Sequence, residues 1–110
     1  MESILTSIKK MLGITDEYTH FDADIIMHIN SVFADLNLLG VGPEEGFSIE
    51  DGTSTWDEFI SDNVKLNAVK TYMHHRVRLL FDPPTSSVVM TSIEKQIAKF
   101  EWSLNVIAES

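Results

Sequence analysis

Apolar residues recur at spacings of three and four along four segments of the chain, a pattern typical of amphipathic helices. The first segment runs from about Ser3 to Leu12 and meets a helix-stop residue at Gly13. The second begins near Asp22, a favourable N-cap residue, and ends before Gly40. Both segments are predicted to be helices with one face in a core. The apolar face of the second comprises Ile25, Ile29, Val32, Phe33, Leu36 and Leu39.

The third predicted helix begins between Trp56 and Asn63 and ends at Phe81, because the residue before Pro83 disfavours helical geometry. It carries more apolar surface than a helix at the edge of a bundle needs. We therefore expect it to be central in the domain, or shared between the core and a partner. One of its stripes contains Leu66, Val69, Met73, Val77 and Leu80, and a second contains Ala68, Tyr72 and Leu79.

The fourth predicted helix follows Ser86 or Ser87 and runs to about Val106. Its core stripe comprises Val89, Ile93, Ile97, Phe100, Leu104 and Ile107. A second set of apolar residues, Val88, Trp102 and Val106, lies opposite this stripe beside Lys95 and Lys99. Two interpretations of Trp102 stay open: it anchors an interface, or it covers a loop of its own chain.

Residues 40–56 change character and contain turn-forming residues between short extended runs. Asp51-Gly52 predicts a hairpin whose second arm ends at Trp56. Two short arms are marginal alone, so Phe47, Ile49 and Trp56 need packing partners in this subunit or in another. The predicted fold is a single all-α domain over residues 1–110, a small bundle of about four helices with a hairpin-like loop between the second and third.

The charge of the chain is unevenly distributed. The net charge is −9, yet twelve acids and no Lys or Arg occur between Met11 and Val64, whereas six bases and four acids follow from Lys65 onward. Such a chain could meet a copy of itself head to tail. No apolar run approaches a membrane span, and the absence of cysteine excludes disulfides and thiolate metal sites. We expect a soluble protein made inside a cell.

No catalytic or metal-binding arrangement is apparent in the sequence. His74 and His75 are adjacent, so on a helix they point about 100° apart and cannot easily chelate one ion. The Asp51-Gly52-Thr53 run is similar to part of an aspartyl phosphatase motif, but the alternating strands and helices of such enzymes are missing. We expect no cofactor, no metal and no enzymatic activity.

A nucleic-acid-binding module is the main alternative of another class. The best candidate basic stripe is Lys70, His74 and Arg78, spaced four residues apart on the third helix. Recognition helices usually bring more basic and amide side chains to one groove, and the pI of this chain is near 4.6. A small helical regulatory or DNA-binding protein therefore stays as the second hypothesis, with salt-dependent duplex binding as its distinguishing property.

Seven segments spread along the chain resemble the small head–tail connector proteins of long-tailed bacteriophages, sometimes labelled DNA-packaging proteins. The most specific segment is Val77–Pro84 (VRLLFDPP). The others are Ile8–Ile14 (IKKMLGI), Ile29–Phe33 (INSVF), Leu39–Gly42 (LGVG), Trp56, Val69–Tyr72 (VKTY) and Phe100–Val106 (FEWSLNV).

The resemblance implies a structural virion protein without catalytic residues. Such a protein assembles in the host cytoplasm and forms an oligomeric ring at the head–tail junction after DNA packaging. Its implied partners are its own copies, the phage portal protein and a tail-side adaptor or tail-completion protein. DNA could pass through the ring, but no specific nucleic-acid binding and no membrane contact are implied.

The candidate interface residues are of two kinds: apolar side chains that need a packing partner, and basic side chains of the third and fourth predicted helices. Arg76 and Arg78 are expected to form ion pairs within or between subunits, with the acids of residues 44–62 as candidate partners. The full set of candidate subunit or partner contacts is Phe47, Ile49, Trp56, Arg76, Arg78, Lys95, Lys99 and Trp102.

Overall fold

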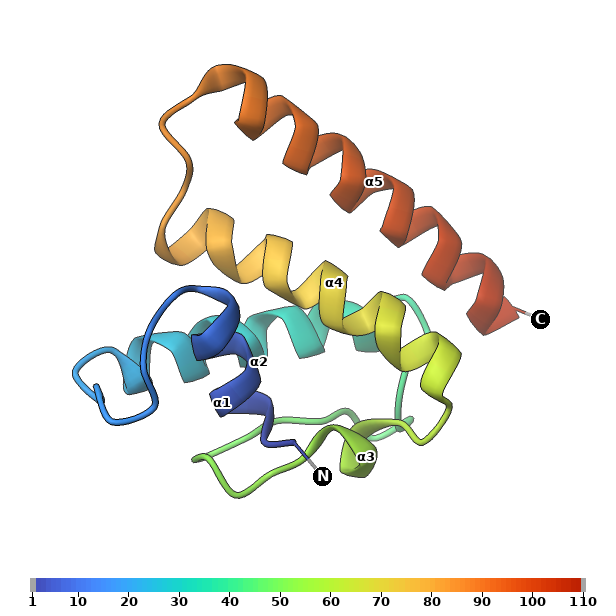
Figure 1. The fold of residues 1–110 in the computed structure, drawn as a ribbon. Helices are drawn as coiled ribbons and strands as arrows, with labels where there is room; N and C mark the ends of the chain where they lie inside the picture. The colour runs from blue at the N-terminus through green and yellow to red at the C-terminus, as the bar shows by residue number, and fades with distance from the viewer. Residues whose placement is uncertain (1, 110) are drawn as a thin grey trace.

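Helix α4 runs through the middle of the molecule, with α2 packed on one side of it and α5 on the other (Figure 1). The structure, a computed structural model, describes the backbone of residues 2–109 and the side chains of residues 2–106. Helix α1 packs against both α2 and α4. The helices are α1 (Ile4–Met11), α2 (Asp22–Leu38), α3 (Trp56–Phe59), α4 (Asn63–Phe81) and α5 (Ser87–Glu109).

The prediction of a small all-α bundle is confirmed, and the ends of its long helices lie close to where the sequence indicated. Gly13 and Gly40 follow α1 and α2 at positive φ, as expected of helix-stop glycines. The side chain of Ser86 accepts a hydrogen bond from Val89 N–H at 3.3 Å. The short α3 is an additional helix. The expected core residue Ile107 lies outside the described side chains.

The prediction that Asp22 is the N-cap of α2 is wrong. The N-cap is Phe21, and Asp22 is the first helical residue. The carboxylate of Asp22 instead lies 2.9 Å from the ammonium of Lys9 on α1. An acid in the first turn also interacts favourably with the helix dipole, so Asp22 both stabilises α2 and connects it to α1.

The predicted hairpin does not form, and none of the described residues belongs to a β-strand. The segment before α3 pairs with the N-terminal segment instead: Ile4 N–H donates to the Ser54 carbonyl at 3.0 Å, and Ser3 and Thr55 form an isolated antiparallel bridge. Asp51 closes a local turn through Thr53 N–H at 2.9 Å. The second arm of the expected hairpin thus found a partner outside the loop.

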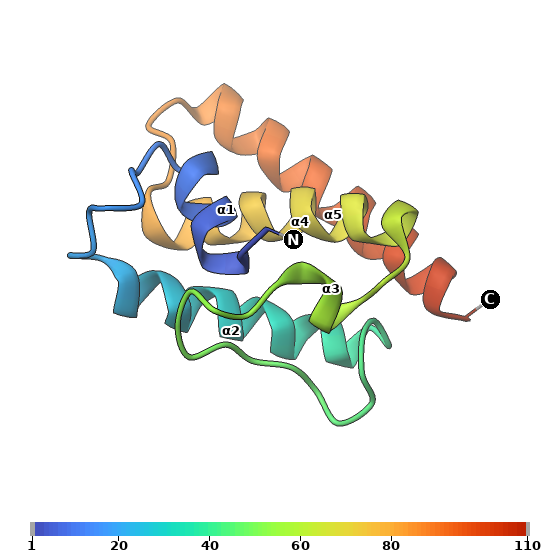
Figure 2. The ribbon, with the colours of Figure 1, turned by 60° about the horizontal axis from the view of Figure 1, so that its bottom comes forward.

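An amide side chain of α2 takes over the role of the missing strand partner. The Asn30 side chain accepts from Ile49 N–H at 2.8 Å and donates to the Ile49 carbonyl at 2.9 Å. Figure 2 shows the loop between α2 and α3 crossing in front of α2. This pair of hydrogen bonds satisfies both backbone groups of a buried residue, and it fixes the loop on the helix.

Aromatic side chains from the loop, α2 and α3 complete the core beneath this crossing. Trp56 is fully buried, and its indole N–H donates to the Ser7 hydroxyl at 2.8 Å. The ring centroid of Phe33 lies 5.1 Å from that of Phe47 and 4.7 Å from that of Phe59. The loop is therefore held by packing inside its own subunit.

Candidate assembly surface

One face of α5 is unpartnered in the subunit. Its opposite side packs on α4 through buried residues such as Ile93 and Leu104. On the outward side, Trp102 is 70% exposed and Val88 is 78% exposed. We call this outward side the α5 outer face. It comprises Val88, Ser92, Lys95, Lys99, Trp102 and Val106, all of them exposed and alternately four and three residues apart.

The exposure of Trp102 excludes one of the two interpretations left open by the sequence, while its role as an interface anchor stays a prediction. Trp102 does not cover a loop of its own chain, because most of its side chain is in contact with solvent. Lys95 and Lys99 are also exposed beside it. The structure thus brings three of the candidate interface residues together on one surface.

The candidate residues of the loop and α3 occupy the subunit's own core. Ile49 is 2% exposed and Trp56 is 0% exposed, while Phe47 is partly buried against Phe33 and Phe59. The expectation that Ile49 and Trp56 lie at a surface contact is therefore corrected: both side chains already have partners within the subunit. Their apolar pattern had indicated burial without showing where the burial occurs.

Arg76 forms an ion-pair network inside the subunit, and its partners differ from the acids of residues 44–62. Its guanidinium donates to Asp35 on α2 and to the Tyr72 hydroxyl, and it lies 3.9 Å from the Glu101 carboxylate on α5. Tyr72 in turn donates to Glu101 at 2.8 Å. These contacts join α2, α4 and α5, so Arg76 acts as a connection between helices rather than as a free surface charge.

The network raises the pKa values of Tyr72 and Arg76. Burial and the hydrogen bond to Glu101 raise the pKa of the Tyr72 hydroxyl to about 12. Burial acts to lower the pKa of Arg76, but the hydrogen bond to Asp35 and the neighbouring Tyr72 raise it overall. Tyr72 remains protonated and Arg76 remains charged at neutral pH.

Arg78 and His74 lie on a different side of α4, against the end of α1. Together with Met11, Leu12, Gly13 and Asp82 they line a depression of about 290 Å³. Arg78 is partly buried and has no ion-pair partner among the described side chains. Burial, with the nearby His75 and Arg78, lowers the pKa of His74, while a hydrogen bond with the Met11 backbone opposes this shift.

The histidine pair is a packing feature of this region. The rings of His74 and His75 stack with centroids 5.6 Å apart, and Nδ1 of His75 is buried without a hydrogen-bond partner. Within the described part of the chain, no group of three or more His, Cys, Asp or Glu side chains could hold a metal ion.

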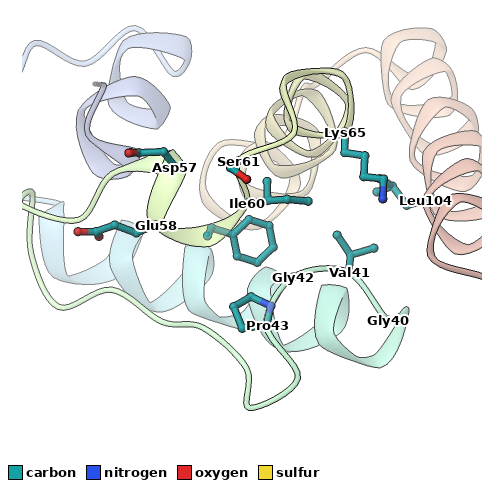
Figure 3. A pocket seen from close by; sticks show the side chains of 11 residues that line it. Gly40, Val41, Gly42, Pro43, Asp57, Glu58, Ile60, Ser61, Lys65 and Leu104 are labelled. Carbon is teal, nitrogen blue, oxygen red and sulfur yellow. The ribbon is translucent and has the colours of Figure 1, made fainter.

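A larger pocket lies where the α2–α3 loop, α3 and the start of α4 meet (Figure 3), and nothing in the sequence had indicated it. Its volume is about 520 Å³. Gly42 is required in its wall because its φ is +90° and a side chain there would collide with the Phe59 ring. We call it the α3 pocket. Its lining includes Val41, Gly42, Pro43, Phe59, Ile60, Ser61, Lys65 and Leu104, with Asp57 and Glu58 at one end.

These features define a small helical protein whose most distinctive surface is an exposed apolar and basic helix face. No described helix is long and apolar enough to cross a membrane. The family model for phage connector proteins matches residues 4–110, so the chain belongs to the phage connector protein family. It is thus a structural connector component of a bacteriophage virion. No curated protein and no solved structure matched the chain.

Proposed function

We propose that this protein forms a ring of identical subunits between the portal of the phage head and the tail, after DNA has been packaged. The observation that carries the proposal is the α5 outer face, where a 70% exposed tryptophan lies beside two lysines on a chain of a connector family. A large aromatic side chain in this setting is typical of an interface anchor. We assign the protein a structural role, contact between subunits, and no catalytic activity.

The charge distribution favours contact between two different faces of the subunit. Seven acids lie between residues 44 and 62, and all of them are exposed: Glu44, Glu45, Glu50, Asp51, Asp57, Glu58 and Asp62. The α5 outer face contributes Lys95 and Lys99, both exposed, and α5 lies on the opposite side of α4 from α3 and the loop before it (Figure 1). Contact between unlike faces generates rings when the rotation between subunits closes.

The alternative of a DNA-binding module is weakened by the position of the basic stripe on α4. Lys70 lies 3.7 Å from the Glu2 carboxylate and packs over the Trp56 ring, while His74 and Arg78 are partly buried next to α1. A recognition helix needs such side chains free to enter a groove. DNA could pass through the proposed ring without sequence-specific contacts from these residues.

The first experiment is light scattering after size exclusion over a hundredfold range of protein concentration, followed by electron microscopy of large species. We expect a species several times the 12.4 kDa subunit mass that appears as closed rings. A subunit that stays monomeric, both alone and with the portal protein of the same phage, would contradict the ring.

The order of assembly can be tested with the same material. The protein should bind assembled portal protein, and it should bind tail-completion protein only when portal is present or the ring has formed. Duplex binding is measured in parallel at low and moderate salt. Tight, sequence-dependent duplex binding without any portal binding would favour the regulatory alternative.

A further inference from the structure

The spacing of the α5 outer face is suited to contact with another structural element. Steps of four and three residues keep Val88, Ser92, Lys95, Lys99, Trp102 and Val106 on one side of the helix over five turns. Two copies of α5 would pair poorly with each other, because Lys95 and Lys99 occupy the centre of this face and would oppose the same lysines of the second copy. The chemistry of the face thus favours an acidic, partly apolar counterpart.

The α3 pocket has the properties of such a counterpart. Its volume of about 520 Å³ is in the range of pockets that accommodate large side chains and small ligands. Val41, Pro43 and Ile60 supply apolar lining. Asp57 and Glu58 lie at one end, and Figure 3 shows their carboxylates directed away from the apolar centre, where a basic partner could meet them. Lys65 lies at the opposite end, beside Leu104, so the acidic side of the pocket is the α3 side.

The geometry of α5 excludes Trp102 from the pocket of its own chain. Leu104 lines that pocket and is fully buried, while Trp102 is exposed. Residues two positions apart on a helix differ in direction by about 200° around the helix axis, so the side chains of Trp102 and Leu104 point to nearly opposite sides. A tryptophan that enters the α3 pocket must therefore come from another copy of the chain.

We propose that the α5 outer face of one subunit docks on the α3 pocket of the next, with Trp102 in the pocket and Lys95 and Lys99 facing the acids around α3. This inference rests on the proposed self-assembly and specifies the contact that produces it. The contact is heterologous, since it joins two different surfaces of the same chain. The apolar anchor supplies buried area, and the charges set the orientation.

The absence of native cysteine allows a direct test by crosslinking. Ala98→Cys places a thiol on the exposed side of α5 one turn before Trp102, and Ser61→Cys places one at the rim of the α3 pocket. Each chain carries one of the two substitutions and is purified separately. One of the two variants also carries a mass tag, so that a mixed dimer differs in mass from dimers of a single variant. The two are then mixed and treated with a short thiol-to-thiol crosslinker.

We expect the mixture to give a mixed dimer in much higher yield than a control mixture in which Met27→Cys replaces Ala98→Cys. Met27 is 59% exposed on α2, away from the proposed contact. Adding Trp102→Ala to the Ala98→Cys chain should reduce the mixed dimer severalfold. Because Trp102 is mostly exposed, we expect that substitution to leave the helical circular dichroism unchanged.

The outcomes distinguish a failure of this contact from a failure of the proposed ring. Mixed crosslinks no stronger than in the control overturn the docking of α5 on the α3 pocket, and closed rings seen in the same sample would leave the proposed function standing. Strong mixed crosslinks without closed rings, with or without portal protein, retain the contact and count against the ring. Mixed crosslinks together with rings support both.

Discussion

At the residue scale, the most informative side chain is a buried lysine. Lys9 is 1% exposed, and its ammonium lies 2.9 Å from the Asp22 carboxylate and donates to the Asp16 carbonyl at 3.0 Å. A buried charge is tolerated only when it is paired. Lys9 thus secures the connection between α1 and α2, with one bond to the loop and one ion pair to the start of α2.

The two partners of this pair should respond differently to substitution. Asp22→Ala leaves Lys9 buried without its counter-ion and should lower the free energy of unfolding by about 3 kcal/mol. Lys9→Met keeps the side-chain volume similar and leaves Asp22 as the group without its partner. Because Asp22 is 26% exposed and lies at a helix start, we expect the free energy of unfolding to fall by about 1.5 kcal/mol or less. Urea denaturation measures both, and equal losses would contradict this account.

His74 should make stability depend on pH in mildly acidic solution. Its folded pKa is below the ordinary value of 6.5, so as the pH falls below that value the unfolded chain binds a proton before the folded one does. The free energy of unfolding is therefore expected to decrease as the pH falls from 7.5 to 5. His74→Gln should flatten this decrease, measured from urea midpoints, while His20→Gln at an exposed position should not. Identical slopes in all three proteins would exclude His74 as the source.

At the element scale, the loop between α2 and α3 depends on one amide. Asn30→Ala would leave both backbone groups of the buried Ile49 without partners, and we expect a loss of about 2 kcal/mol in unfolding free energy. Limited proteolysis should then cut between residues 40 and 55. Asn67→Ala on the exposed side of α4 is the matched control. Equal protease resistance of the two variants would mean that packing alone holds the loop.

The sequence predicted the helices well because their signals are local. Apolar spacing, stop glycines and the residues around Pro83 fixed the long helices to within a few positions. The hairpin was wrong because its outcome depended on distant residues: the 54–56 arm paired with residues 2–4, and Asn30 bonded Ile49 across nineteen positions. The ion pairs of Arg76 with Asp35 and Glu101 were missed for the same reason, as was the α3 pocket.

The exposure of Trp102 was the part of the candidate surface that the sequence could indicate. A tryptophan on the polar side of an amphipathic helix departs from the pattern that core packing requires. Ile49 and Trp56 gave no comparable signal, because a buried side chain and an interface side chain are equally apolar in sequence. Three-dimensional packing alone separates these two cases.

At the scale of the whole molecule, self-association should depend on where a charge lies and not only on the total. Lys99→Glu and Lys10→Glu each change the net charge by −2, from −9 to −11. Both lysines are exposed, but only Lys99 belongs to the α5 outer face. We expect Lys99→Glu to weaken assembly at least about tenfold, a change of about 1.4 kcal/mol, and Lys10→Glu to have little effect. Sedimentation velocity compares them, and equal weakening would assign the effect to general repulsion.

The burial of Leu104 gives the far end of α5 a fixed position. This helix packs on α4 and joins it through the short proline-containing link after Phe81. At 1.5 Å per residue, Trp102 lies about 22 Å along α5 from Ser87. A pivot of about 5° at the link would move Trp102 by about 2 Å, but it would move the fully buried Leu104 by the same amount and open a gap in a close-packed core. The subunit therefore presents Trp102 in one direction, and the partners above and below it must match that direction.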